Sequence, residues 1–206
     1  YGSFKKLKKC FSTFIEKTPP YGKSLICIDN KNLVSLLSKC KTQNILTYGF
    51  NKKSNYQIIN VRKKKNYSIF DLKIKLPSSK IFNINNIVVN LIGDHNITNT
   101  TASIATALNL GIKVNKIKKA LKKFLGIQRR FTKIFSKEKR EFYDDYAHHP
   151  TEITAVINSA RQVYKKRKII SVFQPHRYSR VNALKNEFAQ SFRSSDVVVL
   201  CPVYSA

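Results

Sequence analysis

Apolar and polar positions along the first part of the chain follow two different periods. Phe4, Leu7, Phe11 and Phe14 repeat at the spacing of one helix face, and the pattern ends before two consecutive prolines. This predicts a helix over residues 4–15, and a shorter apolar stretch predicts a second helix around residues 33–37. Segments in which apolar residues alternate with polar ones or run together predict strands at residues 24–28, 45–49, 56–61, 67–76 and 87–92.

Two helices bounded by glycines are expected next. A stretch rich in small residues predicts a helix from about residue 98 to residue 110, with Gly111 as its C-terminal cap. The following helix carries Val114, Ile117 and Leu121 on one side and lysines on the other, and it ends at Gly126.

Beyond Gly126, strands and helices alternate regularly. Helices of this length between consecutive strands favour parallel pairing with right-handed crossovers. We therefore expect a doubly wound, Rossmann-like α/β unit after a junction at residues 127–131. Its strands are expected at residues 141–144, 168–173 and 197–200, and its helices at residues 152–164 and 182–192.

The composition of the 206 residues narrows the class of protein. Hydrophobic residues make up 42% and charged residues 24%, which excludes intrinsically disordered, collagen-like and coiled-coil proteins. No apolar run approaches the roughly 18 residues that a membrane span needs. The chain contains no Met, begins with Tyr1 and stops at Ala206 just after an apolar run, so we expect it to be a piece of a longer protein.

The net charge of +28 makes nucleic acid a candidate partner, because Lys and Arg bind phosphate backbones. However, 30 of the 39 basic residues are Lys, and residues 1–128 hold 24 basic against 4 acidic residues. Proteins that bind nucleic acid usually interleave Arg and aromatic residues. Compositional bias therefore explains the charge better, and a basic nucleic-acid-binding module stays as an alternative.

The cysteines give no evidence of a zinc site or of a disulfide framework. Cys10, Cys27, Cys40 and Cys201 are far apart in the sequence, and no two form a Cys-x-x-Cys pair. We expect buried or incidental thiols in a reducing cytoplasm.

The candidate chemistry lies after the three strands of the second part, because the ligand crevice of an open parallel sheet lies beyond the carboxyl ends of its strands. Two arginines of one segment, Arg177 and Arg180, suit a carboxylate or a phosphate, which a guanidinium binds with two hydrogen bonds. In a second segment, two His lie beside two Asp, and these four side chains are candidates for acid, base, metal ligand or positioning group. The three segments are DDYAHHPTE (144–152), QPHRYSR (174–180) and CPVYSA (201–206).

Structural explanations stand beside these functional ones. Asp144 can cap a turn, Pro150 is typical of a helix start, and one of the two adjacent histidines is expected to point away from the site. By residue type alone, Asp145, His148 and His176 suit a metal site and hence a metal-dependent hydrolase, although no spacing rule fixes such a site.

A further candidate is the segment GDHNITN, residues 93–99, between a buried strand and a helix. Asn96 and Asn99 lie three residues apart at the expected helix start. They can hydrogen-bond a base or ribose, or cap the helix, and the motif taken alone is weak evidence for either.

Four motifs in this order resemble the Mur ligases. They are G-x-H-N-x-x-N from Gly93, F-x-G-x-x-R-R-F from Phe124, D-D-Y-A-H-H-P-T-E from Asp144 and F-Q-P-H-R-Y-S-R from Phe173. The last two in combination are particular to the branch of the family that joins L-alanine to UDP-N-acetylmuramate, with Ser179 where that branch usually has Thr. The branch that recycles murein peptide shares the third motif without the fourth, and it stays as an alternative.

The resemblance implies an α/β chain in two parts: the end of a mixed-sheet, ATP-binding central domain at residues 1–128, and a truncated, Rossmann-like C-terminal domain at residues 129–206. It implies a cytoplasmic ligase of peptidoglycan synthesis that uses ATP and magnesium. ATP phosphorylates the lactyl carboxylate of UDP-N-acetylmuramate, and the amine of L-alanine attacks the acyl phosphate. Because the family's phosphate-binding loop and magnesium ligands have no counterpart here, the isolated chain is expected to be inactive.

The resemblance also implies roles for individual residues. Asn96 and Asn99 match the nucleotide-binding asparagines, with His95 next to the adenine, while Arg130 matches an arginine that contacts ATP and Asp145 the aspartate that binds its ribose. No metal ligand is assigned. The residues that match the group holding the incoming amino acid and the reacting phosphate are Tyr146, His148, Arg177 and Arg180, the last three being the catalytic candidates.

Overall fold

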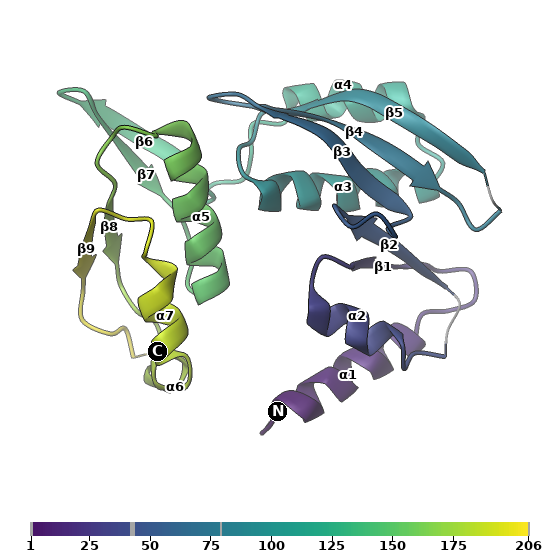
Figure 1. Cartoon of the computed structure of the whole chain (residues 1–206), viewed down its shortest axis with the longest axis horizontal. Helices are drawn as coiled ribbons and strands as arrows, with labels where there is room; N and C mark the ends of the chain where they lie inside the picture. Colours follow the sequence, from purple (N-terminus) through teal and green to yellow (C-terminus); the bar gives the residue numbers. More distant parts are fainter. Residues whose placement is uncertain (1, 42–43, 79, 206) are drawn as a thin grey trace. The chain divides into compact units, whose positions relative to one another are not determined.

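The chain folds into two compact units (Figure 1). Its computed structural model describes residues 2–41, 44–78 and 80–205, so the two ends on which the expectation of a fragment rested, Tyr1 and Ala206, lie outside the described residues. The first unit holds the described residues of 1–63, 67–89 and 96–124, and the second unit holds those of 64–66, 90–95 and 125–206. Within these ranges, no helix is long and apolar enough to cross a bilayer.

A five-stranded mixed sheet in the order β1-β2-β3-β4-β5 organises the first unit. The pairs β1–β2 and β2–β3 are parallel, and β3–β4 and β4–β5 are antiparallel. Phe70, Leu72 and Ile87 are completely buried, and each such side chain contributes about 1.5–3 kcal/mol. The elements are α1 (Phe4–Glu16), β1 (Ser24–Cys27), α2 (Lys31–Leu37), β2 (Ile45–Gly49), β3 (Tyr56–Lys63), β4 (Ser68–Lys75), β5 (Ile81–Val89), α3 (Asp94–Asn109) and α4 (Val114–Lys123).

Most of these elements lie where the apolar pattern predicts them, and β5 is the main difference. It begins at Ile81, six residues before the expected start, and ends at Val89. Its pairing with β4 shifts register between Phe70 and Leu72, and Asn86 has a φ of 56°. This bulge interrupts the alternation of apolar residues, so the first half of the strand does not have the period of two on which its prediction depends.

Helix α3 also begins earlier than expected, at Asp94, whose carboxylate lies in the positive first turn. Asn96 and Asn99 therefore lie inside the helix, one turn apart on the same side, and do not precede it as caps. The other end is as predicted: Gly111 has a φ of 78°, and the N–H of Ile112 donates to the carbonyl of Ala107 at 3.0 Å.

Gly49 ends β2 at a position where a side chain has no room. Its φ is 139°, and a Cβ placed there lies 2.5 Å from Oδ2 of Asp29. That carboxylate accepts the N–H groups of Phe50 and Asn51, each at 2.9 Å, so it is not free to move away.

Gly49→Ala is expected to lower the free energy of unfolding of the chain by about 2–4 kcal/mol, because the methyl group adds a clash to an unfavourable backbone conformation. Urea-induced unfolding measures the loss. Gly111→Ala is the matched control: its φ is also positive, but nothing lies within 4 Å of the added Cβ, so about 1 kcal/mol is expected. Equal losses in the two variants would show that the contact with Asp29 is unimportant.

The second unit has a small apolar core between α5 and the segments that follow it. Ile153 and Ile157 of α5 are buried with Phe173 and Phe188. Strands β8 and β9 pair in parallel, as expected of a βαβ unit, and the pairing begins with Ile170 opposite Val197. The elements are β6 (Thr132–Lys137), β7 (Arg140–Asp144), α5 (Pro150–Val163), β8 (Ile170–Phe173), α6 (Tyr178–Ala183), α7 (Lys185–Ser191) and β9 (Val197–Leu200).

The pairing of β7 differs from the expectation of a parallel neighbour of β8. It forms an antiparallel hairpin with β6, a strand that the sequence pattern does not predict. The hairpin turn consists of Glu138 and Lys139, both with positive φ, and lacks the Asn-Gly or Asp-Gly signal typical of such turns. Between β7 and β8 lies a cavity of about 610 Å³, lined by side chains of β7, α5 and β8.

The expected helix over residues 182–192 is two short helices in the structure. Helix α6 begins at Tyr178, directly after the FQPHR segment. The helical conformation is interrupted at Leu184, where φ is −125° and ψ is 28°, and α7 follows. Leu184 packs against the core of Ile153, Ile157, Phe173 and Phe188. This tertiary contact is absent from the local pattern, from which a single helix is predicted.

Candidate active site in the second unit

Asp145 follows β7 and is held by the backbone at both carboxylate oxygens. Its Oδ2 accepts the N–H of Phe131 and its Oδ1 accepts the N–H of Ala147, each at 2.7 Å. Burial raises the pKa of Asp145 above its ordinary value, although the two N–H groups and Arg130 act in the opposite direction. Each oxygen of a carboxylate has a second lone pair, so this fixed group can still accept hydrogen bonds from a ligand.

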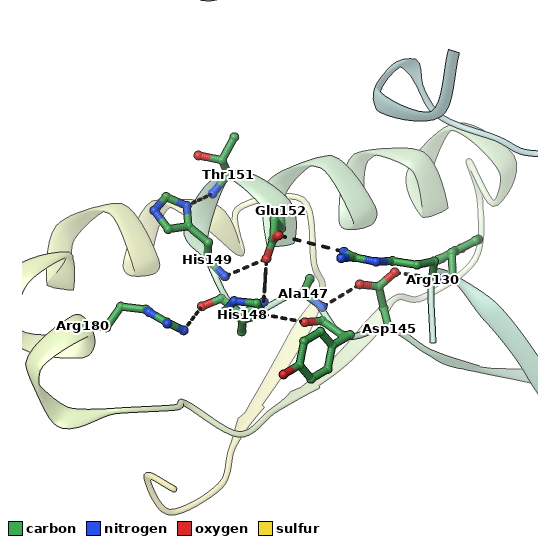
Figure 2. A network of polar contacts seen from close by, with 10 residues as sticks. Arg130, Asp145, Ala147, His148, His149, Thr151, Glu152 and Arg180 are labelled. Carbon is green, nitrogen blue, oxygen red and sulfur yellow. Dashed lines mark hydrogen bonds and ion pairs between the residues drawn. The ribbon is translucent and has the colours of Figure 1, made fainter. Parts of the chain in front are cut away.

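The N-cap and first turn of α5 contain the last residues of the DDYAHHPTE motif (Figure 2). His149 is the N-cap, and its Nδ1 accepts the N–H of Thr151 at 3.3 Å. Pro150 occupies the first helical position, as the sequence indicates. Glu152 folds back and accepts the N–H groups of His148 at 3.0 Å and His149 at 3.2 Å. These reciprocal bonds form a capping box, so of the two adjacent histidines His149 is used by the helix start.

His148 lies between this helix start and α6. Its Nδ1 is 2.9 Å from the carbonyl oxygen of Tyr146, and its own carbonyl accepts a hydrogen bond of 3.5 Å from Nη1 of Arg180 (Figure 2). The ring of Tyr146 meets that of His148 edge-on at 5.1 Å. The structure thus brings four of the expected site residues together: Asp145, Tyr146, His148 and Arg180.

Arg177 stands at the N-cap of α6 in a strained conformation. Its φ is 67°, which is unfavourable for a side chain that is not glycine. Its N–H donates to the carbonyl of Tyr204 at 2.9 Å, and its carbonyl accepts the N–H of Arg180 at 3.1 Å. The neighbouring His176 ring stacks on the Tyr204 ring at 5.4 Å. The backbone around Arg177 is therefore fixed, while its side chain is exposed. Strain of this kind clusters at functional sites.

The expected nucleotide residues are divided between the two units. His95, Arg130 and Asp145 belong to the second unit, and Asn96 and Asn99 to the first. Burial lowers the pKa of His95 below its ordinary value, although Asp145 and Asp94 act in the opposite direction. A neutral imidazole at this position suits an uncharged partner such as an adenine ring.

The open alternative of a metal site is wrong for the part of the chain that the structure describes. No group of three or more His, Cys, Asp or Glu side chains there can hold a metal ion, so Asp145, His148 and His176 do not form the cluster of that alternative. Asp145 instead bonds backbone N–H groups, and His176 stacks on Tyr204.

Comparisons with known proteins assign the family. The sequence model of the Mur ligase middle domain matches residues 1–107, and that of the Mur ligase, glutamate ligase domain matches residues 129–205. The chain belongs to the Mur ligase family. The resemblance expected from the four motifs is thereby confirmed.

Individual relatives of this Mur ligase chain are similar over its whole length. It is 54% identical over 206 residues to the UDP-N-acetylmuramate-L-alanine ligase of Pelagibacter ubique and 41% identical over 207 residues to that of Agrobacterium fabrum. Each match covers 100% of this chain but 44% of the relative, so the chain spans less than half the length of these relatives.

Solved structures show the same α/β fold. The UDP-N-acetylmuramate-alanine ligase MurC from Thermotoga maritima has a TM-score of 0.70 at 24% identity, covering 98% of this chain and 42% of that one. A murein peptide ligase from Psychrobacter arcticus has a TM-score of 0.63 at 20% identity, covering 96% and 47%. At these identities the likeness extends to the fold alone.

Two residues of this candidate site were not among the expected ones. Glu152 bonds to both histidines of the motif, and Arg129 lies over the Tyr146 ring at 4.9 Å and 3.4 Å from Asp144. Glu152 had a signal in the sequence, because a glutamate three residues after an N-cap is typical of a capping box. No local signal identifies Arg129, since its partners follow it by more than a dozen residues.

Glu141 holds β7 against α5 next to this site. Its Oε2 accepts the Tyr164 hydroxyl at 2.6 Å and lies 3.2 Å from Nζ of Lys133, and its Oε1 accepts from Arg167 at 2.9 Å. The hydrogen bond from Tyr164, with those from Lys133 and Tyr143, lowers the pKa of Glu141 to about 2 against the opposing effect of burial.

A pKa below the unfolded value means that Glu141 stabilises the fold above about pH 4.5 and loses this effect as the pH falls toward about 2. Glu141→Gln is expected to lower the unfolding free energy by about 1–2 kcal/mol at pH 7, and this deficit shrinks through that window. Urea midpoints at pH 7 and pH 3 measure it, with the exposed Glu138→Gln as control. A deficit independent of pH would contradict the prediction.

Proposed function

We propose that the chain is part of an enzyme that joins L-alanine to UDP-N-acetylmuramate with the use of ATP. The observation that carries this proposal is 54% identity over all 206 residues with a relative of that name. We further propose that residues 1–128 are the C-terminal part of the central, ATP-binding domain and that residues 129–206 are a truncated C-terminal domain. The matches of the two family models support this division.

The proposed reaction has two steps. ATP supplies a phosphoryl group to the lactyl carboxylate, and the amine of L-alanine then displaces phosphate from the acyl phosphate through a tetrahedral intermediate. Fixed positive charge is needed where the acyl phosphate and the oxyanion develop, and we assign this role to Arg177 and Arg180. Tyr146 and His148 hold the amino acid. No covalent nucleophile from the protein is required, and the remaining gain is the positioning of three substrates.

The nucleotide is assigned to a second group of residues. Asp145 accepts the ribose hydroxyls and Arg130 contacts ATP, while His95, Asn96 and Asn99 serve the base. The fixed carboxylate of Asp145, in which each oxygen has a second lone pair that can accept a hydrogen bond, supports this assignment. We propose magnesium as the companion of ATP. Among the described residues, no group of three or more His, Cys, Asp or Glu side chains is placed to hold a metal ion. Because ATP and a UDP-sugar are its substrates, we place the enzyme in the cytoplasm.

A chimera tests the function directly. In it, this chain replaces the matched segment of the Pelagibacter ubique ligase, to which it is 54% identical. Phosphate release that requires ATP, UDP-N-acetylmuramate and L-alanine together is the expected result. Release with murein tripeptide in place of L-alanine would favour the recycling ligase. Salt-sensitive binding of arbitrary DNA or RNA, without phosphate release, would favour the nucleic-acid-binding module.

A further inference from the structure

The carboxylate of Glu152 meets groups on three sides at the start of α5 (Figure 2). Its Oε2 accepts the backbone N–H groups of His148 and His149 and lies 3.6 Å from Nδ1 of His148. Its Oε1 lies 4.0 Å from Nη1 of Arg130. One side chain thus connects a residue proposed for the amino acid with a residue proposed for ATP.

The capping of α5 does not require this negative charge. In a capping box the third helical residue needs only an acceptor oxygen, and glutamine serves as well as glutamate. In Glu152 the oxygen Oε2 alone accepts both N–H groups, and Oε1 is turned toward Arg130. The two N–H groups and the charges of His148 and Arg130 hold the pKa of Glu152 below its ordinary value, although burial acts against them. The charge is therefore present and directed at His148 and Arg130.

The hydrogen bond of His148 defines which ring nitrogen is available. A carbonyl oxygen can only accept, so at 2.9 Å from the Tyr146 carbonyl Nδ1 carries the hydrogen and Nε2 has the free lone pair. A carboxylate 3.6 Å from Nδ1 favours this tautomer and stabilises the ring when Nε2 takes up a proton. Arg180, at the His148 carbonyl, and Arg130, beyond Glu152, act in the opposite direction.

We propose that Glu152 is a positioning residue, which orients His148 as proton acceptor for the incoming amino acid and Arg130 toward ATP. This inference rests on the proposed function. The ammonium group of L-alanine gives its proton to Nε2 of His148, and the freed lone pair forms the bond to the acyl carbon. Phosphate leaves with the electrons of the broken C–O bond and takes the second proton, which the nitrogen gives up as the amide forms, and the imidazolium returns the first proton to solvent.

The solvent exposure of these side chains determines how much turnover is lost when the charge of Glu152 is removed. Arg130, His148 and Glu152 are all partly exposed, so each ion pair is weak by itself. The cap already fixes the carboxylate, however, so orienting its two partners needs no further ordering of Glu152. Loss of both pairs is expected to lower turnover by about 10-fold.

Three variants of the chimera separate this role from capping. Glu152→Gln keeps an acceptor for the two N–H groups and removes the charge, whereas Glu152→Ala removes both. Glu138→Gln is the matched control, because its carboxylate is exposed on the β6–β7 turn and has no place in the site. The measurements are L-alanine-dependent phosphate release from pH 5.5 to 8.5, the KM of each substrate and the Tm.

We expect Glu152→Gln to keep its Tm within about 2 °C, lose about 10-fold in turnover and raise the KM for ATP but not for UDP-N-acetylmuramate. The acid limb of its pH–rate profile moves to lower pH, because the imidazolium has lost its carboxylate. Wild-type rates and pH profile in Glu152→Gln, with a lowered Tm in Glu152→Ala, would show that Glu152 only caps α5 and would overturn the inference. An unmodified chimera without any activity would instead refute the proposed function, and the inference with it.

Discussion

Replacing Arg177 with glycine is expected to lower the L-alanine-dependent turnover of the chimera by about 10²–10³-fold without destabilising the second unit. The guanidinium is proposed to stabilise charge that develops in the transition state, so its removal affects turnover more than the binding of the UDP-sugar. The backbone at residue 177 has a φ of 67°, which glycine adopts without strain. The exposed side chain leaves no cavity behind.

Phosphate release at saturating substrates and urea-induced unfolding measure the two halves of this prediction. Arg180→Ala is expected to show a similar loss of turnover with a small loss of stability, because Arg180 also bonds the His148 carbonyl. Arg193→Ala, at an exposed position of the same unit, is the control. Unchanged turnover in Arg177→Gly would remove Arg177 from the site, and a marked loss of stability would show that its side chain has a structural role.

The elements that the sequence predicts well are those determined by local patterns. Strand β2 lies at Ile45–Gly49 and strand β9 at Val197–Leu200, as expected, because each is a short apolar run between polar segments. Strand β6 was missed, since its apolar residues are few and exposed and its existence depends on pairing with β7. The break at Leu184 likewise depends on a core formed by distant residues. Pairing partners and tertiary contacts are therefore what the pattern lacks.

The site could be predicted in part for a similar reason. The rule that ligands bind beyond the carboxyl ends of parallel strands indicated the segments of Asp145, His148 and Arg180, which the structure brings together, although β7 pairs antiparallel with β6 and not parallel with β8. Their individual chemistry did not follow from residue type, because a metal cluster and a hydrogen-bonded network use the same side chains. The backbone bonds of Asp145 and the cap formed by His149 and Glu152 distinguish the two, and they depend on loop conformation.

The net charge of +28 is a weaker indication of function than these few residues are. On α4 most of the lysines are exposed and Ile117 is buried against the sheet, as the helical period predicts, while Lys118 donates to the carbonyl of Asn85 on β5. The proposed site instead uses arginines whose positions are fixed by hydrogen bonds of the backbone or side chain. A planar guanidinium can recognise a phosphate or carboxylate by geometry, which a solvated lysine does less well.

Asp145→Asn in the chimera is expected to raise the KM for ATP by about 10–100-fold, because a neutral side chain replaces the charged acceptor proposed for the ribose. The pKa of Asp145 is raised by burial, so its charged form is unfavourable for the fold at pH 7. Its contribution to stability is present below about pH 3.8 and is lost as the pH rises through the folded pKa. In Asp145→Asn, the destabilisation from losing one backbone hydrogen bond is therefore offset in part by the removal of this unfavourable charge.

A nucleotide analogue shows whether the ribose is the group that Asp145 recognises. The wild-type chimera is expected to use 2′-deoxy-ATP about 10-fold less efficiently than ATP, the value of one hydrogen bond to a charged acceptor. In Asp145→Asn the two nucleotides are expected to become nearly equal, because the acceptor that distinguished them has been changed. A discrimination that persists in the variant would assign the 2′-hydroxyl to another residue. Asp145 would then act on the nucleotide only by holding the Phe131 and Ala147 segments in place.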